Sequence, residues 1–223
     1  MDKNNISQRS KFCSEYTDLD ELLNQYSNPL RSHSRRVAVC SAAMAEYADK
    51  SLRPCGLSGI NLSVSMHLGG TCHDIGRLVL PALALAEDDY LRHPVCGAEL
   101  LAKNKDVFFI NKDQAKVVLE MARYHHEQAD GKGFPEGLKA NDIPFSAAIC
   151  AVANELDYLL YMKKGELAKN IRAKKSLKRD DMNDVCKKIK EQAGSKFCES
   201  AVACFEQAWP QLAEKYAEWN HIH

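Results

Sequence analysis

Hydrophobic residues recur along most of this chain at the three- and four-residue spacing of amphipathic helices. One such stripe contains His33, Val37, Cys40, Met44 and Tyr47. Because these positions share one helix face, that face is predicted to be buried and to point His33 at the core. Similar stripes elsewhere predict an all-α, almost entirely helical chain.

Further helices are predicted on both sides of one glycine-rich loop. They cover residues 19–26, 62–75, a segment beginning near His93, a segment from Asn111 to His125, residues 144–161, and a closing hairpin of 180–192 and 198–218. Asn111 and Gln114 have the spacing of a helix-capping pair. The stretch 128–142 contains three glycines and a proline, which predicts a shaped loop.

Charge and composition argue against several classes of protein. Thirty Lys and Arg residues balance thirty Asp and Glu residues, which gives no support to a binder of bulk nucleic acid or of a membrane. No apolar run reaches the roughly 18–20 residues that span a bilayer. The nine cysteines form no CxxC pair and no apolar leader is visible, so we expect a cytoplasmic protein with reduced thiols.

Five of the eight histidines fall at the ends or on the inner faces of the predicted helices: His33, His73, His93, His125 and His126. A single such histidine is usually a hydrogen-bonded core residue. Five imidazoles directed at one interior would be costly without partners, and a metal centre supplies partners to histidine and carboxylate together. Asp74 is the natural bridging ligand, because one carboxylate can give an oxygen to each of two cations.

Several motifs resemble, in order and spacing, those of the HD-GYP family of metal-dependent phosphohydrolases. They are HSRRVA from residue 33, HDIGR from 73, HP from 93, HHEQADGKGFP from 125, AICAVANELD from 148 and AGSKF from 193. The resemblance implies an HD-domain helical bundle over residues 28–208 with a metal centre in its core. Residues 1–27 are then an N-terminal extension, and residues 209–223 a helix end and tail.

Two divalent transition metal ions are expected in that centre. One set of ligands is His33, His73 and Asp74, and the other is His93, His125 and His126. Mixed imidazole and carboxylate ligands suit Fe, Mn, Ni or Zn. Asn154 stands where the family has a metal-binding aspartate, so we include it as a ligand but expect its uncharged oxygen to weaken the first site.

The resemblance implies a phosphodiesterase acting on cyclic di-GMP or a related cyclic dinucleotide through a metal-bridging hydroxide. Asp74 and Arg77 are the expected catalytic residues, with Arg77 standing where the family usually has lysine. The expected substrate-binding residues are Gly131, Gly133, Phe134, Pro135, Asp157 and Lys163. Phe134 replaces a family tyrosine and keeps a ring that can stack on a base. The family's RPYR-like phosphate-binding segment is missing, and Lys163 lies near its place.

Two alternatives stay open. A catalytically degenerate signalling module would keep the fold and bind a nucleotide or a partner protein, as Asn154 and the missing RPYR segment suggest. An HD-type hydrolase of another phosphate ester is the second alternative. The role of Glu127 is also open between orienting an imidazole and solvating a helix end, whereas Asp130 is expected to cap the loop.

Overall fold

The computed structural model describes residues 18–48, 62–80, 87–162 and 179–222, and this part of the chain is helical and contains no strand. The all-α prediction is therefore confirmed. The elements are α2 (Leu19–Leu23), α3 (Asn28–Ala45), α4 (Leu62–Cys72), the 3₁₀ turn η2 (Ile75–Leu78), α5 (Glu87–Lys103), α6 (Lys105–Phe108), α7 (Lys112–Tyr124), α8 (Phe145–Asp157), the π turn η3 (Tyr158–Met162), α10 (Arg179–Lys190) and α11 (Glu199–Ile222).

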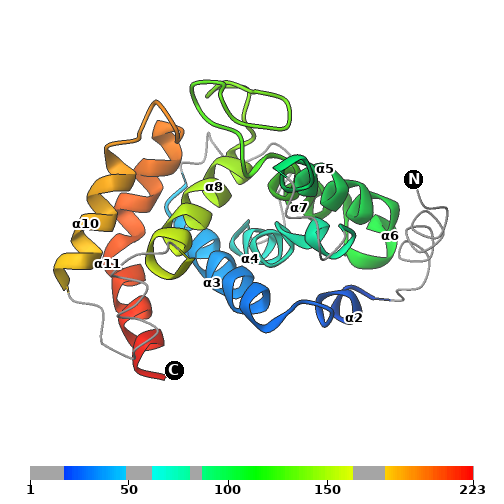
Figure 1. The fold of residues 1–223 in the computed structure, drawn as a ribbon, viewed down its shortest axis with the longest axis horizontal. Helices are drawn as coiled ribbons and strands as arrows, with labels where there is room; N and C mark the ends of the chain where they lie inside the picture. Colours follow the sequence, from blue (N-terminus) through cyan, green and yellow to red (C-terminus); the bar gives the residue numbers. More distant parts are fainter. Residues whose placement is uncertain (1–17, 49–61, 81–86, 163–178, 223) are drawn as a thin grey trace.

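Helix α8 occupies the middle of the molecule (Figure 1). The α10–α11 hairpin lies on one side of it, and α4, α5 and α7 lie on the other. Two apolar clusters hold these elements together. One contains residues of α3, α4, α7, α8, α10 and α11, and the other contains residues of α2, α4, η2, α5 and α7. Helices α4 and α7 thus contribute to both clusters.

Two glycines allow the backbones around this region to approach closely. A Cβ atom on Gly70 of α4 would lie 2.5 Å from the Cα of Ala38 on α3. A Cβ atom on Gly76 of η2 would lie 1.9 Å from the carbonyl oxygen of His93 on α5. Since both collisions are with backbone atoms, only glycine lets α3 meet α4 and η2 meet α5 at these distances.

Several helix ends differ from the sequence prediction. Tyr47 follows the end of α3 and is 40% exposed, so the predicted buried stripe stops at Met44. Helix α5 begins at Glu87, which places His93 inside the helix instead of at its start. The Asn111 side chain accepts from the Gln114 amide at 2.9 Å, as predicted, but the Gln114 side chain accepts from Ile110 at 3.2 Å instead of from Asn111.

Packing is continuous across both boundaries predicted for the domain. Leu22 of α2 is fully buried in the second cluster, although it precedes residue 28. Helix α11 runs unbroken past residue 208, and its Leu212 and Tyr216 are buried in the first cluster. Within the described ranges, no helix combines the length and apolar character that crossing a bilayer requires.

Candidate metal centre

Six side chains from four parts of the fold converge at the junction of the two clusters. They are His33 on α3, His73 and Asp74 after α4, His93 on α5, and His125 and His126 after α7. Five of them are buried, and His126 is partly exposed. The prediction that distant segments bring these residues together is confirmed by the fold.

The two carboxylate oxygens of Asp74 face different histidines. Oδ1 lies 3.1 Å from Nε2 of His93 and 3.7 Å from Nε2 of His125. Oδ2 lies 3.7 Å from Nε2 of His73 and 3.8 Å from Nε2 of His33. This division is the arrangement that a carboxylate bridging two cations requires.

Hydrogen bonds donated by Nδ1 orient four of the five imidazoles. His73, His93 and His125 place Nδ1 at 2.8, 2.6 and 3.0 Å from the backbone carbonyls of Gly70, Tyr90 and Met121, and His33 places it 2.7 Å from the Asp157 carboxylate. Carbonyl and carboxylate oxygens only accept, so each Nδ1 is the protonated nitrogen. Each Nε2 lone pair is therefore directed inward, as in histidines that ligate metals.

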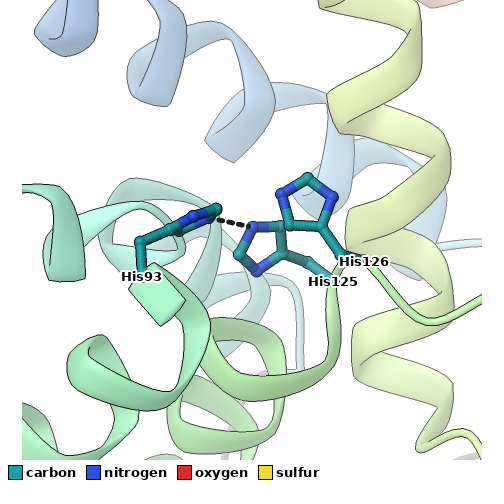
Figure 2. Close-up of side chains that lie close together, drawn as sticks. All are labelled: His93, His125 and His126. Atoms are coloured by element: carbon teal, nitrogen blue, oxygen red, sulfur yellow. Dashed lines mark hydrogen bonds between the residues drawn. The ribbon is translucent and has the colours of Figure 1, made fainter. Parts of the chain in front are cut away.

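A conflict between lone pairs follows from these tautomers. Nε2 of His93 lies 3.2 Å from Nε2 of His125, the contact drawn as a dashed line in Figure 2. The two lone pairs repel each other at this distance, and a cation bound between them would remove the repulsion. A further proton would also remove it, but would leave a buried imidazolium. His73 gives a second indication, since its Nε2 is buried without a hydrogen-bond partner.

The protonation states also suit metal ligands. Burial lowers the pKa of His73 to about 4 and of His126 to about 3, and it lowers the pKa of His125 well below its ordinary value. Burial alone would raise the pKa of Asp74, but the neighbouring His73, His93 and Arg77 hold it well below its usual range. At neutral pH, His73, His125 and His126 are therefore uncharged and Asp74 is ionised.

The residues present thus fit divalent metal ions. In each of two groups the potential ligand atoms lie within 4.8 Å of one another: His93, His125 and His126 form one group, and His33, His73 and Asp74 form the other. Asn154 of α8 lines the cavity beside them. The number and identity of the ions stay a prediction.

A cavity of about 890 Å³ opens over this centre and is lined by His33, Asp74, His125 and His126. Arg77 lines it too, with its Nε 2.7 Å from Oδ2 of Asp74. The Phe134 ring, also at the cavity, stacks on His126 with ring centroids 4.6 Å apart and planes 20° apart. One face of that ring is therefore already occupied by a predicted metal ligand.

Four of the predicted substrate-binding residues do not line the cavity. The Asp157 side chain is fully buried and its carboxylate binds His33 and Arg36, away from the cavity. Gly131, Gly133 and Pro135 shape the loop, but the lining of the cavity does not include them. Lys163 lies outside the described residues.

The two acidic residues after the twin histidines serve the loop. Glu127 is buried and accepts from the backbone amides of Glu136 and Leu138 at 2.8 and 2.9 Å, so it neither orients an imidazole nor solvates a helix end. Asp130 accepts from the backbone amide of Lys132 at 3.1 Å, which confirms its predicted capping role.

Sequence reasoning missed several polar residues that line the cavity, among them Tyr90, Glu155, Tyr158 and Lys196. The Tyr90 hydroxyl lies 3.4 Å from Nε2 of His126, and the Tyr90 ring lies 5.5 Å from the Arg77 guanidinium carbon. A tyrosine one turn before His93 was the available signal for it. Glu155 and Lys196 lie within motifs that were recognised, but their spacing along the chain gives no sign that the two side chains pair.

Known proteins resemble this chain. A cyclic di-GMP phosphodiesterase of Thermotoga maritima is 27% identical over 159 residues, covering 67% of this chain and 39% of that protein. The 3'3'-cGAMP-specific phosphodiesterase 2 of Vibrio cholerae is 27% identical over 148 residues, covering 62% of this chain and 27% of that protein. The chain spans less than half the length of either curated relative.

The fold also resembles that of a solved structure. It is Bd1817, a HDG"Y"P protein from Bdellovibrio bacteriovorus, with a TM-score of 0.56 and 17% identity, covering 92% of this chain and 62% of that one. A family model described as HD domain matches residues 19–182, well over half of the sequence. The chain therefore belongs to the HD domain family, and the HD-GYP resemblance of its motifs is confirmed.

Proposed function

We propose that this chain is a metal-dependent phosphodiesterase that hydrolyses cyclic di-GMP or a related cyclic dinucleotide. One observation carries the proposal: each oxygen of Asp74 faces its own histidine group at the edge of a cavity of about 890 Å³. That volume suits a ligand of dinucleotide size. The names of the two phosphodiesterase relatives point to the same class of substrate.

A pair of divalent ions at this centre would supply Lewis-acid activation of water and neutralise the charge that develops on a phosphodiester. The protein's own residues would hold these ions and orient the substrate. His33, His73 and Asp74 would hold one ion and His93, His125 and His126 the other. The Nδ1 hydrogen bonds of His33, His73, His93 and His125 fix these imidazoles before an ion binds, which lowers the cost of ordering them.

Arg77 and Tyr90 would contact the substrate. The Asp74 carboxylate holds the pKa of Arg77 above its ordinary value against the effect of burial, so the guanidinium stays charged. It can stabilise a phosphate but is a poor proton donor to a leaving group, unlike the lysine usual in the family. The Tyr90 hydroxyl, beside His126, offers a neutral hydrogen-bond donor at the same edge of the cavity.

The proposal is tested by incubating the purified protein with cyclic di-GMP or 3'3'-cGAMP in the presence of Mn, Fe, Ni or Zn and separating the products. We expect linear dinucleotide or mononucleotide to form. Activity should fall at least about 100-fold in Asp74→Ala and His126→Ala, and stay unchanged in Glu206→Gln on the surface of α11. Absence of turnover with every metal would contradict the proposed activity.

A degenerate binding module is the second candidate, and Asn154 favours it. Asn154 brings a neutral oxygen to the cavity where a carboxylate would help to hold an ion. Such a module would bind a cyclic dinucleotide tightly and release no product. Calorimetric binding measured beside the turnover assay separates the two candidates.

A further inference from the structure

The cavity contains a second polar group apart from the metal centre. Glu155 of α8 and Lys196 of the α10–α11 connection both line it, and Nζ of Lys196 lies 2.6 Å from Oε2 of Glu155. Their side chains are 16% and 36% exposed, so both are partly enclosed yet accessible from the cavity. The α10–α11 hairpin, whose connection contains Lys196, and α5, which contains Tyr90, lie on opposite sides of α8 (Figure 1).

The backbone around Lys196 is anchored. Its amide donates to the carbonyl of Gln192 at 3.1 Å, and its carbonyl accepts from Ala129 at 3.2 Å. The neighbouring carbonyl of Ser195 accepts from Asp130 at 2.8 Å. These bonds tie the α10–α11 connection to the loop after the twin histidines, so the ammonium is presented from a fixed base.

The charges of the pair argue against a phosphate ligand. Lys196 and Glu155 are mutually neutralised at 2.6 Å, and a phosphate approaching the ammonium would also meet the carboxylate. A neutral ligand with both donors and acceptors suits the pair better. The carboxylate retains lone pairs that can accept further hydrogen bonds, and the ammonium has two further N–H donors.

The Watson–Crick edge of guanine has the complementary pattern. Its N1–H and N2–H groups would donate to Glu155, and its O6 would accept from Lys196. In the same orientation, adenine would place its N1 lone pair against the carboxylate and its N6 amino group against the ammonium. In a shifted orientation that satisfies both groups, adenine would form one hydrogen bond fewer than guanine. Tyr158, one turn after Glu155, lines the same cavity and is 48% exposed, so its ring offers a face on which a base can stack.

We propose that Glu155 and Lys196 recognise a guanine base and thereby select guanine-containing cyclic dinucleotides over cyclic di-AMP. This inference rests on the proposed function, whether the ligand is hydrolysed or only bound. Sites that hydrogen-bond a substrate edge reject an analogue with the wrong edge strongly. We therefore expect the wild-type protein to prefer cyclic di-GMP to cyclic di-AMP by at least about tenfold.

The test compares the two nucleotides with wild-type protein, Glu155→Gln and Lys196→Met. The measured quantity is the ratio of kcat/KM values, or of Kd values if the ligand is bound without turnover. Glu155→Gln should lower the guanine preference about tenfold, because a glutamine amide can donate to adenine N1. Lys196→Met should lower the kcat/KM or the affinity for cyclic di-GMP more than that for cyclic di-AMP, because the substitution removes the donor to guanine O6.

Glu206→Gln is the matched control, since Glu206 forms a similar 2.6 Å pair with Lys190 outside the cavity. Its ratio should equal that of the wild-type protein. An unchanged ratio in both cavity variants, with melting temperature and metal content preserved, overturns the guanine assignment and leaves the proposed function standing. A wild-type protein that neither binds nor hydrolyses any cyclic dinucleotide overturns the proposed function itself.

Discussion

Nδ1 of His33 lies 2.7 Å from Oδ2 of Asp157, although the two residues are 124 positions apart. Arg36, one turn after His33 on α3, donates to the same carboxylate, with its Nη2 3.0 Å from Oδ2. The carboxylate thus fixes the tautomer of His33 and directs Nε2 toward Asp74. Asp157 acts on the candidate metal centre through His33, without touching the cavity.

Replacing Asp157 by Asn should therefore weaken both stability and metal binding. In either orientation of the new side chain its NH2 group faces a donor, either Nδ1–H of His33 or Nε–H of Arg36, and Arg36 loses the charge of a fully buried partner. We expect a loss of about 3 kcal/mol, which lowers Tm by about 6–12 °C. Calorimetric titration with Mn²⁺ should show about tenfold weaker binding. Glu136→Gln, in an exposed pair with Arg123, should change neither quantity.

Replacing Asn154 by Asp should strengthen metal binding. Asn154 lines the cavity beside His33 and Asp74, and a carboxylate would add the negative charge that its amide lacks. We expect at least about tenfold tighter Mn²⁺ binding in a calorimetric titration. Gln207→Glu adds the same charge to the exposed side of α11 and is the control. Equal affinities in all three proteins would show that position 154 does not limit the site.

Replacing Gly76 by Ala should disturb the backbone that carries His93. The new Cβ would lie 1.9 Å from the His93 carbonyl oxygen and 2.6 Å from the Gly97 nitrogen. We expect a loss of about 3 kcal/mol in unfolding free energy, with a parallel loss of bound metal. Gly69→Ala meets the flexible thioether of Met121 instead and should cost clearly less. The prediction fails if denaturant unfolding gives equal losses for both variants.

The stability of the metal-free protein should depend on pH between about 6.5 and 3. Burial lowers the pKa of His73 to about 4 and of His126 to about 3. Their folded forms bind a proton less readily than the unfolded chain, so stability is fully present above the unfolded pKa of about 6.5. It falls with decreasing pH by about 1.4 kcal/mol per unit for each histidine, until the folded pKa is reached.

Thermal melting in a chelator at pH 7, 6 and 5 measures this dependence. His73→Gln removes one titrating group and should flatten the slope by the share of one histidine. A constant Tm across this range in the wild-type protein would contradict the prediction. Adding Mn²⁺ should steepen the dependence, because protons and metal compete for the same Nε2 atoms.

Much of the fold could be predicted from hydrophobic spacing, because amphipathic helices bury one face and leave a local record of it in the chain. The stripe from His33 to Met44 is buried as predicted, whereas Tyr47 lies beyond the end of α3 and is exposed. The start of α5 was misplaced because Pro94 resembles a residue of the first turn, yet the helix contains it.

The identities of the six residues at the centre were also determined by the sequence, because His and Asp at these spacings are a local signal. Only the tertiary structure decided the partner of each residue. It assigned Asp157 to His33 and Arg36, Glu127 to the loop backbone, and Glu155 to Lys196. These pairings depend on how helices that are distant in sequence pack against one another. The packing includes the close backbone approaches at Gly70 and Gly76, and such approaches depend on contacts across the whole core, which no local stretch of sequence records.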